Sequence, residues 1–178
     1  MRRTSAAACA LACACVCARA AAQPWAPGLF FGTTMGVGAG WLEHPQVSEG
    51  PRAGFVWDVL AGWQLSPRWA AAAVLTSWQL TPIGTPWHLH TFGARVELAP
   101  WEARAWYFAG VLGLAMTDGD VQKRAGVGAG VTVGHRWALN GWVSLAAEGG
   151  VLAHAYSDGW AAQPFLVAHL RFHGRSEP

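Results

Sequence analysis

The chain has 178 residues, enough for one domain with a sizeable core. Its composition is 53% hydrophobic and only 12% charged, with 12 tryptophans, 22 glycines and a single lysine, Lys123. So low a charged share indicates a surface that faces lipid, because soluble domains carry about 25% charged residues. The body of the chain has no apolar run near the roughly 20 residues of a membrane helix. A closed barrel is the other structure that satisfies its backbone in lipid.

The first 22 residues have the pattern of a cleavable secretory signal peptide. Arg2 and Arg3 form the basic region, residues 6–18 form a short apolar segment, and Ala20, Ala21 and Ala22 supply the cleavage site. We therefore expect residues 1–22 to be removed and residues 23–178 to form the mature domain. A membrane anchor and a lipoprotein are the alternatives for this segment.

All four cysteines lie within the expected signal peptide, at positions Cys9, Cys13, Cys15 and Cys17. The mature chain would then have no cysteine. Four cysteines in an exported chain usually indicate disulfides, but that inference does not apply here. Cleavage also removes three arginines, which takes Lys+Arg from 12 to 9 against 10 acids, a net charge near −1. The basic balance belongs to the signal peptide and indicates no nucleic-acid partner.

The rest of the chain contains eight segments in which apolar side chains alternate with glycine or polar residues. A period of two predicts β-strands. The predicted strands are 28–42, 53–65, 69–80, 90–98, 103–116, two within 125–156, and 164–173. The segment 69–80 alternates poorly because residues 70–73 are all alanine, which leaves a local helix open.

The segment 125–156 shows the pattern most clearly. Its outgoing arm places Val127, Val131 and Val133 on one face and glycines on the other, and Asn140-Gly141 is a hairpin turn signal. One face is apolar and free of charge, while the other combines glycine with a few charges. This combination is typical of a strand with lipid outside and a narrow, partly polar lumen inside.

The predicted connections alternate in length along the chain. Tight turns follow the even-numbered strands, at 66–68, 99–102 and 138–141, whereas longer polar loops follow the odd-numbered strands, at 43–52, 81–88, 117–124 and 157–163. Outer-membrane barrels have short periplasmic turns and longer outside loops. We therefore expect both termini on the periplasmic side.

Tryptophans gather near the predicted strand ends, as expected for the aromatic girdles of a membrane barrel. Those near tight turns are Trp69, Trp101, Trp106, Trp137 and Trp142, and those at the opposite ends of their strands are Trp41 and Trp78.

With this pattern, residues 28–173 resemble the small eight-stranded outer-membrane β-barrels of the OmpA/OmpX type. The resemblance implies an all-β, eight-stranded antiparallel up-and-down transmembrane β-barrel. It implies a monomer in the outer membrane of a Gram-negative-type bacterium, with outer-membrane lipid and the barrel-assembly machinery as partners. Members of this group usually end on an aromatic residue, a role that Phe172 fits, although residues 173–178 follow it.

Alternation directs six charged side chains into the lumen, namely Asp58, Arg95, Glu97, Arg136, Glu148 and Arg171. Unpaired buried charges are strongly unfavourable, so three acids and three bases indicate mutual pairing. We expect Glu148 and Arg171, on neighbouring strands, at similar depth, and Arg95, Glu97 and Arg136 nearer the tight turns. The network is either a gate or a plug of salt bridges, and a lumen just wide enough for side chains favours the plug.

The histidines offer a possible metal site. His88 and His90 share one face near an outside loop, with His44 on another, and paired imidazoles can bind Zn or Cu. No cysteine or carboxylate completes a ligand set, so we predict no metal and no cofactor. We interpret His154 and His169 as polar side chains that fill the lumen.

Some small barrels act on lipid A, and one such family uses a His-Ser pair near its C-terminal strand. In this chain His173 and Ser176 lie beyond the predicted strand, and there is no GxSxG, phosphate loop or metalloprotease motif. We predict no enzymatic activity. The predicted function is a structural outer-membrane barrel with a plugged lumen. The alternatives are a narrow pore for ions or small solutes and a lipocalin-like soluble barrel that binds an apolar ligand inside.

Overall fold

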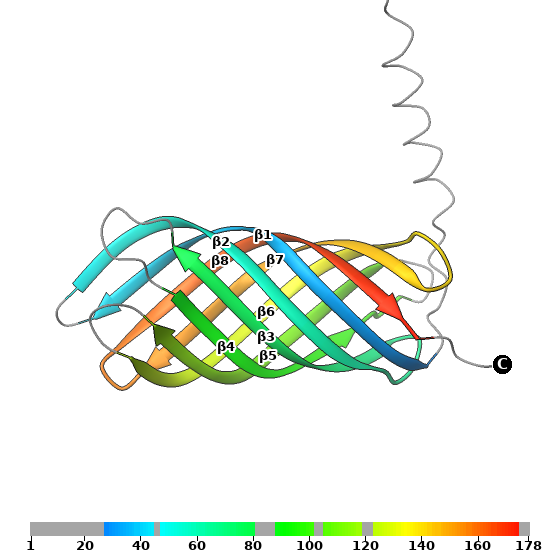
Figure 1. Cartoon of the computed structure of the whole chain (residues 1–178), viewed down its shortest axis with the longest axis horizontal. Coiled ribbons are helices and arrows are strands. Elements are labelled where there is room, and N and C mark those ends of the chain that lie inside the picture. Colours follow the sequence, from blue (N-terminus) through cyan, green and yellow to red (C-terminus); the bar gives the residue numbers. More distant parts are fainter. Residues whose placement is uncertain (1–26, 45–46, 81–87, 102–104, 119–122, 175–178) are drawn as a thin grey trace, which may run out of the picture.

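The structure, a computed structural model, describes residues 27–44, 47–80, 88–101, 105–118 and 123–174. Eight antiparallel strands close into a barrel in which β1 also pairs with β8 (Figure 1). The strands are β1 (Gly28–His44), β2 (Val47–Gln64), β3 (Trp69–Leu80), β4 (His88–Leu98), β5 (Trp106–Asp118), β6 (Arg124–Ala138), β7 (Val143–Tyr156) and β8 (Gly159–His173). The near end of the barrel, as we call it, is where β1 begins and β8 finishes; the opposite end is the far end. The described residues contain no helix long and apolar enough to cross a membrane.

All eight predicted strands are present, including β3 with its run of alanines. The sheet explains why this segment extends rather than coils. β3 pairs with β2 on one side and β4 on the other, so that Ala72 lies opposite both Gly62 and Arg95. A helix here would leave the facing edges of β2 and β4 without hydrogen-bond partners.

Two of the four loops predicted to be long are wrong, because the strands continue into them. The ladder between β1 and β2 runs on to the pair His44 and Val47, inside the predicted loop 43–52. β8 begins at Gly159 and pairs there with Tyr156, inside the predicted loop 157–163. Polar residues suggested loops at both places, but an antiparallel ladder accepts polar side chains on a face that is exposed to water. The other two long loops lie largely outside the described residues, at 81–87 and 119–122.

The outward face of the barrel is apolar along most of its height. Leu112, Leu114 and Val131 are 63%, 65% and 70% exposed, values that large apolar side chains reach in clusters only on a surface covered by something other than water. Tryptophans are exposed towards both ends, with Trp69, Trp101, Trp106 and Trp142 at the near end and Trp41 and Trp160 at the far end.

Trp78 departs from the predicted far-end girdle, because its indole fills the lumen. The side chain is only 1% exposed and packs with Leu42, Val56 and Leu89. The space for the ring comes from β1 and β2. A Cβ on Gly40 of β1 would lie 1.7 Å from Cη2 of Trp78, and a Cβ on Gly54 of β2 would lie 2.5 Å from its Nε1. The girdle prediction was wrong for this residue, which instead belongs to a buried apolar layer in the far half of the lumen.

The near half of the lumen is divided between apolar and charged residues. Strands β1 to β3 contribute a buried apolar cluster of Phe30, Leu60, Ala70 and Val74. Strands β4, β6, β7 and β8 contribute five of the six buried charged residues, and the sixth, Asp58, lies on β2. This division places most ionised groups on one side of the lumen, where they can reach one another.

Candidate functional site

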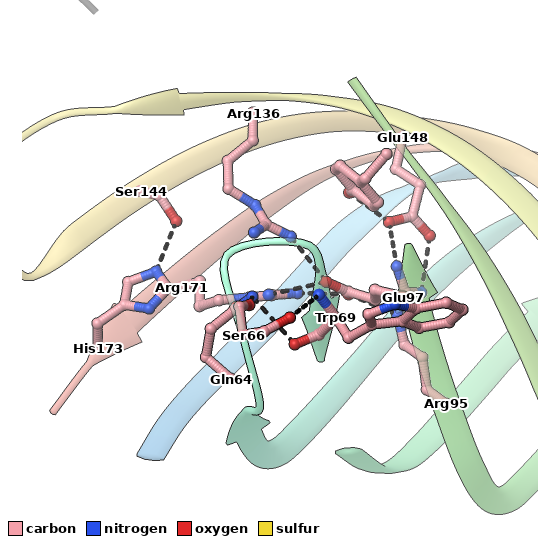
Figure 2. Close-up of polar contacts among 11 residues, drawn as sticks. Gln64, Ser66, Trp69, Arg95, Glu97, Arg136, Ser144, Glu148, Arg171 and His173 are labelled. Atoms are coloured by element: carbon pink, nitrogen blue, oxygen red, sulfur yellow. Dashed lines mark hydrogen bonds and ion pairs between the residues drawn. The ribbon is translucent and has the colours of Figure 1, made fainter. Parts of the chain in front are cut away.

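Glu97 of β4 is the centre of the charged cluster (Figure 2). Its Oε1 accepts hydrogen bonds from Nε of Arg95 at 2.9 Å and Nη2 of Arg171 at 2.5 Å. Its Oε2 accepts from Nη1 of Arg171 at 2.9 Å and Nη2 of Arg136 at 2.7 Å. One carboxylate therefore binds three guanidinium groups, which come from β4, β6 and β8, and both of its oxygens are fully used.

A second carboxylate, Glu148 of β7, extends the cluster towards the middle of the lumen. Nη1 and Nη2 of Arg95 donate to its two oxygens at 2.8 and 2.6 Å, in a bidentate arrangement. The hydroxyl of Tyr107 donates to Oε2 at 2.6 Å. Arg95 is thus the link between the two carboxylates, and five of the six predicted residues form one continuous network.

Tyr107 belongs to this network but was missing from the prediction. The signal for it was available in the sequence, because Tyr107 lies between the outward-facing Trp106 and Phe108 and must therefore point inward. Its phenol is uncharged, so a pattern of charged lumenal residues does not include it. A buried tyrosine hydroxyl usually has a hydrogen-bond partner. For an inward tyrosine on a strand near inward carboxylates, a carboxylate is the candidate partner.

The expected match in depth between Glu148 and Arg171 is wrong. A loop over 157–163 would have set the two residues close together across β7 and β8. The turn is shorter, so the register places Glu148 opposite Val167 and Arg171 opposite Ser144. Arg171 therefore lies nearer the near end and binds Glu97, while Glu148 binds Arg95 instead.

Two aromatic rings hold arginines from the side. The guanidinium carbon of Arg171 lies 4.2 Å from the ring centroid of Phe30, and that of Arg136 lies 4.7 Å from the ring centroid of Tyr107. A guanidinium is attracted to the face of an aromatic ring, and the contact restricts its plane. The rings thus help to keep both side chains aimed at Glu97.

Asp58, the sixth predicted residue, lies apart from the network. Its carboxylate is buried, Oδ1 has no hydrogen-bond partner among the described residues, and none of the three arginines forms an ion pair with it. A cavity of about 20 Å³, which also contacts Thr132, Arg95 and Glu148, separates them. That volume suits about one water molecule. The network alone holds three cations and two anions, and Asp58 supplies the third negative charge across the cavity.

The predicted lumenal histidines are both buried. His154 shares hydrogen bonds with Oγ1 of Thr91 at 2.6 Å and Nε2 of Gln163 at 3.2 Å. His169 is buried beside the network, and its Nε2 has no partner within the described part of the chain.

The remaining predicted histidines are His44, His88, His90 and His173. His88 and His90 stack with ring centroids 6.2 Å apart, and the side chain of His44 lies outside the described residues. No group of three His, Cys, Asp or Glu side chains in the described ranges is placed to hold a metal ion. His173 contacts Oγ of Ser144 at 3.1 Å, whereas Ser176 lies outside the described residues. Ser144 is buried, and His173 is half-buried.

No family model matches this sequence, and no curated protein matches it. Solved structures do. The neisserial surface protein A (NspA) matches with a TM-score of 0.62 at 17% identity, over 83% of this chain and 99% of its own. Ail, the attachment invasion locus protein of Yersinia pestis, matches with a TM-score of 0.60 at 8% identity, over 82% of this chain and 99% of its own. Identities this low carry the fold and not the residues of a site. The chain has the fold of the small eight-stranded outer-membrane β-barrels.

Proposed function

We propose that the protein is a structural barrel of the outer membrane whose lumen is closed by the network of Arg95, Glu97, Arg136, Glu148 and Arg171. The observation that carries this proposal is the coordination of Glu97 by three arginines from three strands. These charge-assisted hydrogen bonds occupy one side of the near half of the lumen, and the apolar cluster of Phe30, Leu60, Ala70 and Val74 occupies the other. An eight-stranded barrel has little interior space beyond that.

The apolar layer around Trp78 supports the same proposal. Any path along the lumen must pass that layer in the far half and the charged network in the near half. The cavity between them, at about 20 Å³, is isolated on this proposal. A soluble lipocalin-like barrel fits poorly, because its apolar side chains should face a ligand cavity, whereas here the large exposed ones face outward.

We further propose that lipid surrounds the exposed apolar wall and that the near end faces the periplasm. The barrel would act as a monomer and would meet the assembly machinery during insertion. We propose no enzymatic role. The wall of exposed leucine, valine and tryptophan supports a membrane location, and the common end of β1 and β8 supports a shared side for both termini.

Conductance in planar bilayers tests the closed lumen. We expect the parent protein to pass no steady current. Glu148→Gln should weaken the hold on Arg95, and Glu97→Gln should release three arginines together, so both variants should show brief openings. The matched control is Asp158→Asn, which makes the same chemical change in the far-end turn, where Asp158 pairs with Arg124 at 3.3 Å. A steady current through the parent protein would establish a narrow pore instead.

Gel migration before and after boiling tests the membrane location. A folded outer-membrane barrel in membrane fractions should migrate differently in the two states. Recovery of the mature chain in the soluble periplasm would exclude the membrane proposal and leave the lipocalin-like alternative.

A further inference from the structure

A row of three aromatic side chains crosses the outer wall of the barrel close to its near end. Trp106 of β5 lies edge-on to His135 of β6, with ring centroids 5.0 Å apart and an interplanar angle of 80°. Trp137 also packs against His135, with ring centroids 4.6 Å apart. The sheet register sets this row, because Trp106, His135 and Ala147 lie opposite one another on adjacent strands.

A groove opens beside this row where β7 carries small residues. Ala147 and Gly149 form its floor, and Val133 and Leu166 join the aromatic rings in its walls. The cavity measures about 510 Å³ and is open on its outer side. It is a hollow in a wall that is otherwise built of large apolar side chains. The one charged residue in its lining, Glu148, has its carboxylate in the lumen, bound to Arg95.

His135 is chemically unusual for its position. Along β6 and β7 it is the one titratable side chain that points outward, among valines, alanines and tryptophan. Its Nδ1 is buried and has no hydrogen-bond partner among the described residues, whereas Nε2 is not among the buried polar atoms that lack a partner. If the imidazole proton is on Nε2, the buried Nδ1 is only an acceptor, and the N–H donor points away from the barrel. A polar group on a lipid-facing wall is unfavourable unless something there bonds to it.

The depth of the groove in the proposed membrane indicates which group could accept a hydrogen bond from His135. Tryptophans in membrane barrels lie at the depth of the lipid headgroups, so Trp106 and Trp137 set His135 at that depth. Phospholipids present phosphodiester oxygens there and acyl chains directly below. We propose that this groove binds one phospholipid, with an acyl chain along Ala147 and Gly149 and a phosphodiester oxygen accepting a hydrogen bond from Nε2 of His135.

A second copy of the chain is the competing occupant. The convex wall of another barrel fits a concave groove badly, whereas a flexible acyl chain fits it well. The groove also continues the apolar wall that the proposed membrane location gives to lipid. The lipid site rests on that location and does not depend on whether the lumen is closed.

Photocrosslinking in vesicles tests the site. The purified barrel is reconstituted with phosphatidylethanolamine that carries a diazirine in one acyl chain, and the labelled residues are mapped by mass spectrometry. We expect labelling to concentrate on residues that line the groove. Ala147→Leu fills the groove opposite His135 and should remove that concentration. Ala153→Leu, an outward alanine on the same strand outside the groove, is the matched control and should leave it unchanged.

A second arm tests recognition of the phosphate. Diacylglycerol with the same diazirine chain has no phosphodiester, and should label the groove less than the phospholipid does. His135→Leu should abolish that preference, since loss of one hydrogen bond to a charged acceptor corresponds to about a tenfold change in occupancy. Equal labelling by the two probes in the parent would overturn the role of His135.

Three further outcomes distinguish failure of the lipid site from failure of the proposed membrane location. Even labelling around a barrel that floats with the vesicles overturns the lipid site and leaves the membrane location standing. A barrel that migrates as a dimer on native gels, with Trp106 and Trp137 left unlabelled, assigns the groove to a dimer. A chain that does not float with the vesicles overturns both proposals.

Discussion

Glu97 makes more charge-assisted hydrogen bonds than any other residue of the lumenal network, while Arg95 connects it to Glu148. Replacing one partner of an ion pair in this network should change the stability of the barrel differently from replacing both partners. Loss of one partner leaves the other buried and ionised, whereas loss of both leaves an apolar gap. The arrangement is therefore suited to a double-mutant cycle.

We predict that Arg95→Leu lowers the free energy of unfolding by about 3–5 kcal/mol, because it leaves Glu148 and Glu97 without a shared cation. The double variant Arg95→Leu with Glu148→Leu should recover a large part of that loss. Urea unfolding of the barrel in vesicles measures both. Equal stability of the single and double variants would show that Arg95 does not bind Glu148 in the folded protein.

The contact of Trp78 with Gly40 gives a second prediction for single residues. Gly40→Ala should destabilise the barrel by about 1–3 kcal/mol, as overpacking does, since the added methyl group meets the indole. The loss should shrink in a Trp78→Leu background. Gly110→Ala is the matched control, because nothing lies within 4 Å of a methyl group there. Urea unfolding applies again, and an undiminished loss with Trp78→Leu would place the clash elsewhere.

At the scale of strands and turns, the hairpin of β6 and β7 combines a predicted and an unpredicted feature. The turn falls where Asn140-Gly141 indicated. Its hydrogen bonds differ from those of a two-residue hairpin turn. Oδ1 of Asn140 accepts hydrogen bonds from the backbone N–H groups of Trp142 and Val143 at 2.9 and 2.8 Å. The side chain of Asn140 thus replaces part of the backbone ladder.

We predict that Asn140→Ala lowers the free energy of unfolding by about 1–2 kcal/mol through loss of these two hydrogen bonds. Leu139→Ala changes an exposed neighbour in the same turn and should have a smaller effect. Unfolding in urea compares the two variants, and a larger effect at Leu139 would show that contacts of its side chain hold the turn.

Strand positions and side-chain direction could be predicted from the sequence, whereas register could not. Alternation alone directed Arg95, Glu97 and Glu148 into the lumen, since a period of two fixes the face. The partner of each charge depended on where the turns close, and polar residues after Tyr156 concealed the tight pairing with Gly159. Trp78 was misplaced for a related reason, because the space for it comes from glycines on two other strands.

At the scale of the whole barrel, closure depends on the seam between β1 and β8. Gly36 of β1 lies opposite Val167, and a Cβ there would lie 2.1 Å from the carbonyl oxygen of Leu166. Glycine is the only residue that leaves this approach free. Neighbouring positions on the outer face of β1 have no such restriction.

We predict that Gly36→Val prevents closure and reduces the fraction of chain that shows a folded, heat-modifiable band. Valine favours strands over glycine, so a loss of folded protein would be steric in origin. Met35→Val, on the exposed face next to it, is the control and should fold like the parent. Normal folding of Gly36→Val would show that the seam has room for a side chain.

The bond between Glu97 and Arg171 joins residues 74 positions apart, on β4 and β8. Because β8 completes the sheet, this contact can form only when the last strand docks against the first. Interactions made after the rate-limiting step leave the folding rate unchanged and slow the reverse reaction. The network should therefore govern how long an assembled barrel persists rather than how quickly it inserts, and the protein's resistance in the membrane would be kinetic in origin.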